Sequence, residues 1–154
     1  RGVGAGLGPL IASRFTQGSL SRVLRICGLA GVVFSACYLV AAWSPVSYLA
    51  AVVIAIGHLG GGSQWTLSAS GLQLRTPDHI RGRVMAGDFA IVTLVMSITG
   101  LGAGVMSELV GVRWTITAFA SAAAVAGFVY IAATRPLVQQ LATEEAAADA
   151  TTSV

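Results

Sequence analysis

The sequence predicts an all-α protein, a polytopic bundle of transmembrane helices, and two observations carry this prediction. Hydrophobic residues make up 55% of the 154-residue chain and charged residues only 10%, whereas soluble domains carry roughly 25% charged residues. The mean hydropathy is accordingly +0.81. In addition, the apolar residues stand in continuous runs, and about 20 apolar helical residues cross the hydrocarbon core of a bilayer. Membrane strands alternate apolar and polar residues over about ten positions, so this pattern favours helices.

We expect a transmembrane bundle at 1–136, with spans at about 2–13, 20–43, 46–74, 84–109 and 113–135. The first of these segments is too short to cross a bilayer. Because the chain opens with Arg1 and continues directly into apolar sequence, we interpret this segment as the last half of a transmembrane helix that the start of the sequence cuts through. The tail at 137–154 is rich in Ala, Thr and acidic residues. We expect it to be cytoplasmic and disordered, apart from a weakly helical stretch at 139–148.

Residues that cap or break helices place the boundaries between these segments. Thr76 is expected to be the N-cap of a short helix, with Pro77 at its first helical position, that leads into the span 84–109. Gly111 is expected to end that span. Pro136 is expected to end the last span, because proline cannot donate the backbone hydrogen bond that continues a helix.

The arginines predict how the bundle is oriented in the membrane. Around the loops after the first and third segments, and after the last span, the chain carries Arg14, Arg22, Arg25, Arg75, Arg81, Arg83 and Arg135. The opposite side carries only Arg113. Cytoplasmic loops of membrane proteins have an excess of basic residues. We therefore expect a multi-pass protein of the cell (inner or plasma) membrane with a cytoplasmic C-terminus. The same explanation accounts for the net charge of +3 without a nucleic-acid partner.

Several kinds of chemistry find no support in the sequence. No Ser/His/Asp or Cys/His set, no His-Glu-x-x-His motif and no cluster with metal-ligand spacing is visible, so we expect neither a metal nor a cofactor. Cys27 and Cys37 fall in one predicted helix, where ten residues separate their Cα atoms by about 15 Å. That distance excludes a disulfide bond between them.

The span 46–74 holds the richest set of polar residues. Polar side chains of membrane helices normally face the interior of the bundle, so His58, Gln64 and Trp65 are candidate residues of a substrate cavity. Because imidazole titrates near neutral pH, His58 is also a candidate proton-binding residue. The alternative is a neutral histidine that is hydrogen-bonded to a neighbour.

Asp88 lies about one turn inside the span 84–109, where a lone charge is costly. We expect it to pair with Arg81, Arg83 or Arg14 at the cytoplasmic face. Such a pair is either a static contact or part of a cytoplasmic gate that opens during transport.

Glycines also recur at a spacing of four, which places both members of a pair on one helix face. Such pairs let two helix backbones approach closely in lipid. The alternative is that they form sliding surfaces that change between conformations. The pairs are Gly4 and Gly8, Gly57 and Gly61, and Gly100 and Gly104.

The most specific string in the chain is Thr-Pro-Asp-His-Ile-Arg-Gly-Arg-Val-Met-Ala at 76–86, preceded by Leu72 and Gln73. It resembles the cytoplasmic loop before the eleventh helix of major facilitator superfamily transporters, in the enterobactin-exporter-like branch of drug and siderophore efflux proteins. The segments 100–104 and 8–14 resemble the Gly-rich eleventh helix and the end of the eighth helix. In one departure, the loop after Gly8 ends in Arg14 but lacks the Asp of the family's Gly-x-x-x-Asp-x-x-Gly-Arg motif.

This resemblance implies the C-terminal part of a twelve-helix major facilitator fold, from the end of helix eight to helix twelve. It implies a secondary transporter, not an enzyme, that exports a small amphiphilic molecule such as a drug or siderophore in exchange for protons. The expected partners are the lipid bilayer, the substrate, protons and the missing N-terminal half of the transporter. Two alternatives stay open, a non-catalytic membrane scaffold subunit and, less favoured, a membrane-embedded enzyme.

Overall fold

The computed structural model describes residues 2–16 and 19–152, and within them the side chains except those at 149, 151 and 152. These residues form α1 (Gly2–Thr16), α2 (Leu20–Ala42), α3 (Ser47–Arg75), α4 (Asp78–Val110) and α5 (Val112–Thr152). No strand occurs in the described part of the chain, which confirms the all-α prediction. Arg1 lies outside the described residues.

Three helices are long and apolar enough to cross a membrane: Leu20–Ala42, Asp78–Val110 and Val112–Ala148 within α5. They correspond to the predicted spans 20–43, 84–109 and 113–135, and they support a multi-pass membrane protein. α3 has the length, with 29 residues, but glycines and polar residues make it less apolar. α1, with 15 residues, is short for a span, as expected.

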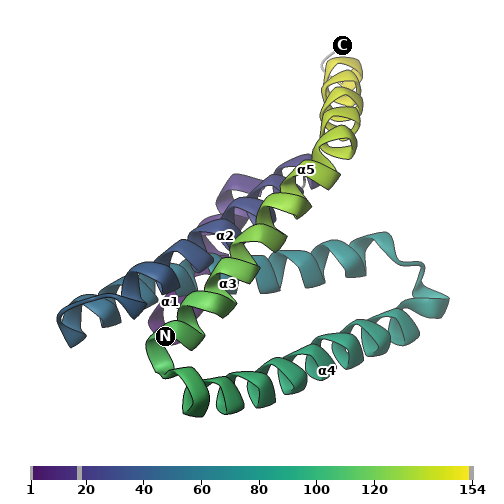
Figure 1. Cartoon of the computed structure of the whole chain (residues 1–154). Helices are drawn as coiled ribbons and strands as arrows, with labels where there is room; N and C mark the ends of the chain where they lie inside the picture. Colours follow the sequence, from purple (N-terminus) through teal and green to yellow (C-terminus); the bar gives the residue numbers. More distant parts are fainter. Residues whose placement is uncertain (1, 17–18, 153–154) are drawn as a thin grey trace.

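Helices α1, α2, α3 and α5 pack together, whereas α4 runs apart from them. α2 packs along both α3 and α5, and α1 packs on α3. α4 contacts mainly α5, and Figure 1 shows it separated from the other helices for most of its length. None of its residues is buried. Even within the packed helices the core is small, a cluster of Ala12, Cys27 and Leu67.

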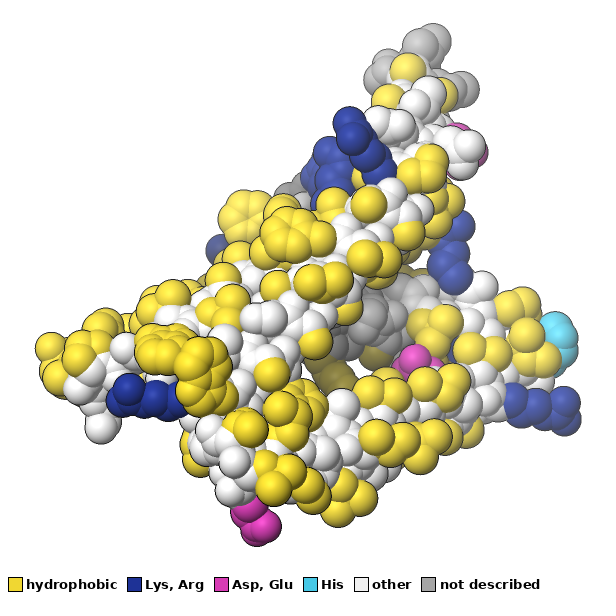
Figure 2. Space-filling model, in the orientation of Figure 1, with side chains coloured by type: hydrophobic (Ala, Val, Ile, Leu, Met, Phe, Trp, Pro, Cys, Tyr) yellow, Lys and Arg dark blue, Asp and Glu magenta, His cyan; other side chains and the backbone are white. Residues whose placement is uncertain are grey.

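Apolar side chains dominate the surface as well as the core. Figure 2 shows hydrophobic side chains over most of the visible face, with arginine side chains in a few separate groups. Large apolar residues on every helix are more than half exposed, among them Leu10 at 65%, Phe89 at 63% and Phe128 at 60%. In water such a surface would promote association, whereas in a bilayer the lipid chains cover it. The structure therefore fits the hydrocarbon environment that the composition predicted.

The structure corrects the predicted start of the helix after α3. Thr76 is the C-cap of α3 and not the N-cap of α4: its hydroxyl donates to the Leu72 carbonyl oxygen at 2.6 Å. α4 begins at Asp78, with Pro77 in the N-cap position. Pro77 itself is not helical, with φ −56° and ψ 143°, so α4 starts one residue later than predicted. The hydroxyl of Thr76 is engaged by α3 and does not cap α4.

The end of α5 also differs from the prediction. Pro136 lies inside α5, which continues to Thr152, so proline does not end the helix and the described part of the tail is helical. Figure 1 shows α5 bending near this point, where its colour passes from green to yellow, as expected for a helix that loses one backbone hydrogen bond at proline. The residues that follow are mainly good helix formers, and Val138 is buried. At the other end, Gly111 closes α4 with φ +85°, as predicted.

Candidate functional site

His58 lies against two aromatic residues of α2. Its ring centroid is 5.5 Å from that of Phe34 and 6.0 Å from that of Tyr38, and these two rings are themselves 4.7 Å apart. The Nδ1 atom of His58 is 2.9 Å from the carbonyl oxygen of Ile54, one turn earlier in α3. A neutral imidazole in this position carries its proton on Nδ1 and leaves Nε2 as an acceptor. The arrangement therefore presents a proton-accepting nitrogen on an imidazole that packs against two aromatic rings.

Phe34 and Tyr38 also line a groove of the size class that binds small molecules. Its volume is about 760 Å³. α2 contributes Phe34, Ser35 and Tyr38, and the facing wall comes from α4 and α5, including Val95, Met96, Thr99, Thr115 and Phe119. Figure 2 shows the molecule hollowed between α4 and the helices above it. One pair of aromatic residues thus separates His58 from a ligand-sized groove.

The groove is apolar except for a few hydroxyl groups, and three of these donate to backbone carbonyls of nearby turns. Ser35, which is 1% exposed, donates to the Gly31 carbonyl oxygen at 2.9 Å. Thr99 donates to Val95 at 2.8 Å, and Thr115 to Gly111 at 3.0 Å. Because a hydroxyl oxygen also has two lone pairs, these groups can still accept hydrogen bonds. The lining therefore suits an amphiphile with a few donors on an apolar body.

The other two cavity candidates stand apart from this cluster. The Gln64 side-chain amide lies beside Gly31 of α2, where its oxygen is 3.4 Å from the position that a Cβ on Gly31 would take. Trp65 is 53% exposed, and no described ring packs on it. Of the three residues singled out in the sequence, only His58 packs against aromatic residues that line the groove.

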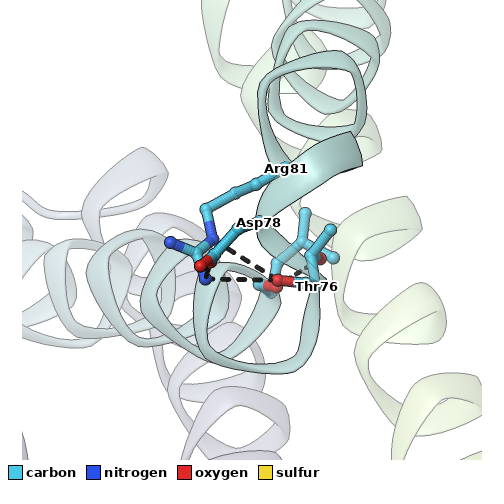
Figure 3. Close-up of polar contacts among 4 residues, drawn as sticks. Thr76, Asp78 and Arg81 are labelled. Carbon is cyan, nitrogen blue, oxygen red and sulfur yellow. Dashed lines mark hydrogen bonds and ion pairs between the residues drawn. The ribbon is translucent and has the colours of Figure 1, made fainter.

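At the α3–α4 loop, Arg81 joins the two helices. Its guanidinium forms an ion pair with Asp78 and also donates to the carbonyl oxygen of Thr76, from Nε at 3.4 Å and from Nη2 at 3.3 Å (Figure 3). The C-terminus of α3 is thereby tied to the first turn of α4. The residues of this link all belong to the string at 76–86.

The pairing expected for Asp88 is absent from the described part of the chain, where Asp78–Arg81 is the ion pair. Helix geometry gives the reason. Arg81 is on the same face as Asp88 but about 10 Å away along the axis, and Arg83 points to a different side. Asp88, Arg83 and Arg14 are all exposed.

Glu145, which the sequence did not single out, caps the start of α2. Its carboxylate accepts hydrogen bonds from the Leu20 and Ser21 backbone amides at 2.8 and 3.3 Å, and from the Ser19 and Ser21 hydroxyls at 2.7 Å. The hydroxyl bonds, followed by the amide bonds, lower the pKa of Glu145 from its ordinary value of 4.5 to about 2. A carboxylate at a helix N-terminus also interacts favourably with the helix dipole.

The opposite end of the α2–α5 pair is held by tryptophans. The rings of Trp43 and Trp114 meet edge to face, with centroids 5.3 Å apart, and Trp43 Nε1 donates to the Thr117 hydroxyl at 3.1 Å. α2 and α5 are therefore antiparallel and in contact at both ends. Tryptophans are enriched where a protein meets the membrane–water interface, so this end fits the side of the bundle opposite the arginine-rich loops.

The glycine pairs fall into two groups. A Cβ on Gly4 or Gly8 would overlap the carbonyl oxygen of Ala55 or Leu59 in α3, and a Cβ on Gly57 would lie 2.9 Å from the Cβ of Cys37. Gly61 is nearly as close to α2, at 3.0 Å from the ring of Phe34. Gly100 and Gly104, on α4, have nothing within 4 Å of the same position. The first two pairs thus bring helices together, while the third lies on an uncovered face.

Comparisons with known proteins identify no relative of the chain: it matches no protein-family model, no curated protein and no solved structure.

Proposed function

We propose that this chain is the C-terminal part of a secondary transporter of the major facilitator type, which exports a small amphiphilic molecule in exchange for protons. The observation that carries the proposal is the position of His58 behind Phe34 and Tyr38, which line the groove of about 760 Å³. Ionisable residues inside membrane proteins commonly mark ion or substrate pathways. A titratable group separated from a ligand-sized groove by two aromatic rings is suited to coupling substrate binding to protonation.

The coupling follows from electrostatics. Protonation places a positive charge on the imidazole, whose centroid is within 6.0 Å of the Phe34 and Tyr38 rings, and aromatic rings attract cations. The charged ring then competes with the substrate for the same aromatic side chains. Proton binding therefore favours substrate release, and loss of the proton favours substrate binding, which is the alternation that an exchanger requires.

On this proposal the polar residues of the cytoplasmic end form a gate. Arg81 ties α3 to α4 through Asp78 and the Thr76 carbonyl, and Arg83, Asp88 and Arg14 are further candidates for this network. The C-terminus is cytoplasmic, and the remaining helices of a twelve-helix fold cover α4. We accordingly expect this chain alone, reconstituted into vesicles, to give no saturable proton-linked flux.

The test is an uptake assay in everted vesicles that contain the whole transporter. With an imposed proton gradient, the wild type should accumulate amphiphilic dyes, and His58→Gln should abolish the gradient-driven accumulation while leaving dye exchange without a gradient. The other histidine of the chain, His79, is exposed in α4, so His79→Gln is the matched control. Equal gradient-driven uptake by His58→Gln and the wild type would refute the coupling role.

A membrane scaffold is the second candidate, and the uncovered Gly100–Gly104 face of α4 favours it. Such a face can dock a helix of another protein. A scaffold would be recovered with a stoichiometric partner protein. In that case neither the wild type nor the two histidine variants would transport dye. A transporter should show transport without such a partner.

A further inference from the structure

A second groove lies between α2 and α5, at the end where Glu145 caps α2. Its volume is about 400 Å³, and it is separate from the groove beside α4. The helices approach closely at its floor, where a Cβ on Gly28 would lie 2.6 Å from Cγ1 of Ile131. The main lining residues are Leu24, Arg25, Leu29, Ile131, Arg135 and Val138.

This groove combines two cations with an apolar trough. Arg25 enters it from α2 and Arg135 from α5. Both are exposed, and neither takes part in an ion pair within the described residues. The nearby carboxylate of Glu145 is already engaged by Ser19, Leu20 and Ser21. The groove therefore carries two guanidinium groups that form no ion pair with an acidic side chain of the described residues.

The predicted spans 20–43 and 113–135 place the two arginines toward the headgroup end of the groove. Arg25 lies about 8 Å into α2 from its first residue, at 1.5 Å per residue, and Arg135 immediately precedes the proline bend of α5. From the arginines toward the middle of α2 and α5, the lining consists of Leu29, Ile131 and Thr134. Guanidinium groups bind phosphate oxygens in a bidentate manner, and basic pockets between helices on the cytoplasmic side bind anionic headgroups.

We propose that this groove binds an anionic phospholipid. The phosphate lies between the guanidinium groups of Arg25 and Arg135, and one acyl chain lies along Leu24, Leu29 and Ile131. The site requires that the chain spans a membrane but does not depend on transport. A lipid in this position would bridge α2 and α5 between their tryptophan contact and their Glu145 contact.

The test uses the full chain in detergent and native mass spectrometry, with phosphatidylglycerol and phosphatidylcholine added separately. We expect the wild type to retain one phosphatidylglycerol in preference to phosphatidylcholine. The double variant Arg25→Gln/Arg135→Gln should bind phosphatidylglycerol about 10- to 30-fold more weakly, because each substitution removes one guanidinium charge that attracts the phosphate. The matched control is Arg14→Gln/Arg22→Gln, which removes the same charge from exposed arginines at the same end that do not line the groove.

A further variant separates the groove from general charge attraction. Leu29→Trp fills the trough from an exposed position, 60% accessible, and keeps both arginines, so it should also weaken retention. Circular dichroism of each variant checks that it is folded. The proposal is overturned if the control weakens binding as much as the groove variant does, or if phosphatidylcholine is retained equally well. Displacement of the lipid by millimolar inorganic phosphate alone would equally overturn it, since the acyl chain would then add nothing.

Discussion

Replacing Gly8 with alanine should separate α1 from α3, because the added methyl group has no room. The new Cβ would overlap the Leu59 carbonyl oxygen and lie 2.9 Å from both the Leu59 carbonyl carbon and the Ser63 hydroxyl. Non-bonded carbon atoms pack at about 3.5–4.0 Å. The obstacle is backbone, which cannot rotate away, so the helices must move apart by roughly 1 Å. Overpacking of this kind typically costs about 1–3 kcal/mol.

The assay is unfolding of the full chain in mixed micelles by increasing SDS, followed by far-ultraviolet circular dichroism. Gly8→Ala should lower the free energy of unfolding by about 1–3 kcal/mol. Gly104→Ala is the control, because nothing lies within 4 Å of its new methyl group, and it should change the value by less than about 0.5 kcal/mol. Equal effects of the two substitutions would show that the contact between α1 and α3 is not the source of the destabilisation.

Two further predictions concern the cap on α2 and the cysteines. Because the folded-state pKa of Glu145 is about 2, below its ordinary 4.5, its stabilising effect is complete above pH 4.5 and is lost as pH falls toward 2. Glu145→Gln should therefore unfold at a lower SDS concentration than the wild type at pH 6, and the difference should shrink toward pH 2. The exposed neighbour provides the control, because Glu144→Gln should show no such difference. A difference between Glu145→Gln and the wild type that stays constant from pH 6 to pH 2 would contradict the role of Glu145 as a cap. Cys27 is buried and Cys37 only partly so, so a membrane-permeant maleimide should label Cys37 faster than Cys27 in the folded chain. Mass spectrometry of single-cysteine variants measures the two labelling rates. Faster labelling of Cys27 would contradict the packing of α2.

The helices could be predicted from the sequence because they depend on local properties. Long apolar runs identify α2, α4 and α5 whatever their neighbours are, and Gly111 ends α4 through its own backbone conformation. The start of α4 was missed by one residue, at Asp78 instead of Pro77. The rule that a residue before proline avoids helical backbone fits an N-cap and a C-cap equally, so it does not assign Thr76 to either helix.

The rest depends on contacts between distant parts of the chain, which local patterns do not encode. Glu145 reaches Ser19 across 126 residues, so the composition of the tail gives no sign of its contact with α2. Phe34 and Tyr38 escaped notice because aromatic residues in an apolar run look like residues that face lipid. Their importance depends on where α3 places His58 and where α4 leaves a groove, and both are matters of tertiary packing.

The contact between Glu145 and α2 has a consequence for biosynthesis. α2 leaves the ribosome well before the residue that caps it, and at about 5–20 residues per second the interval is roughly 6–25 s. During that time the first amides of α2 rely on water and on the Ser19 hydroxyl, which accepts from the Arg22 amide at 3.2 Å. The arginine-rich end of the bundle is therefore the last to close, and a nascent chain that stops short of Glu145 leaves it open.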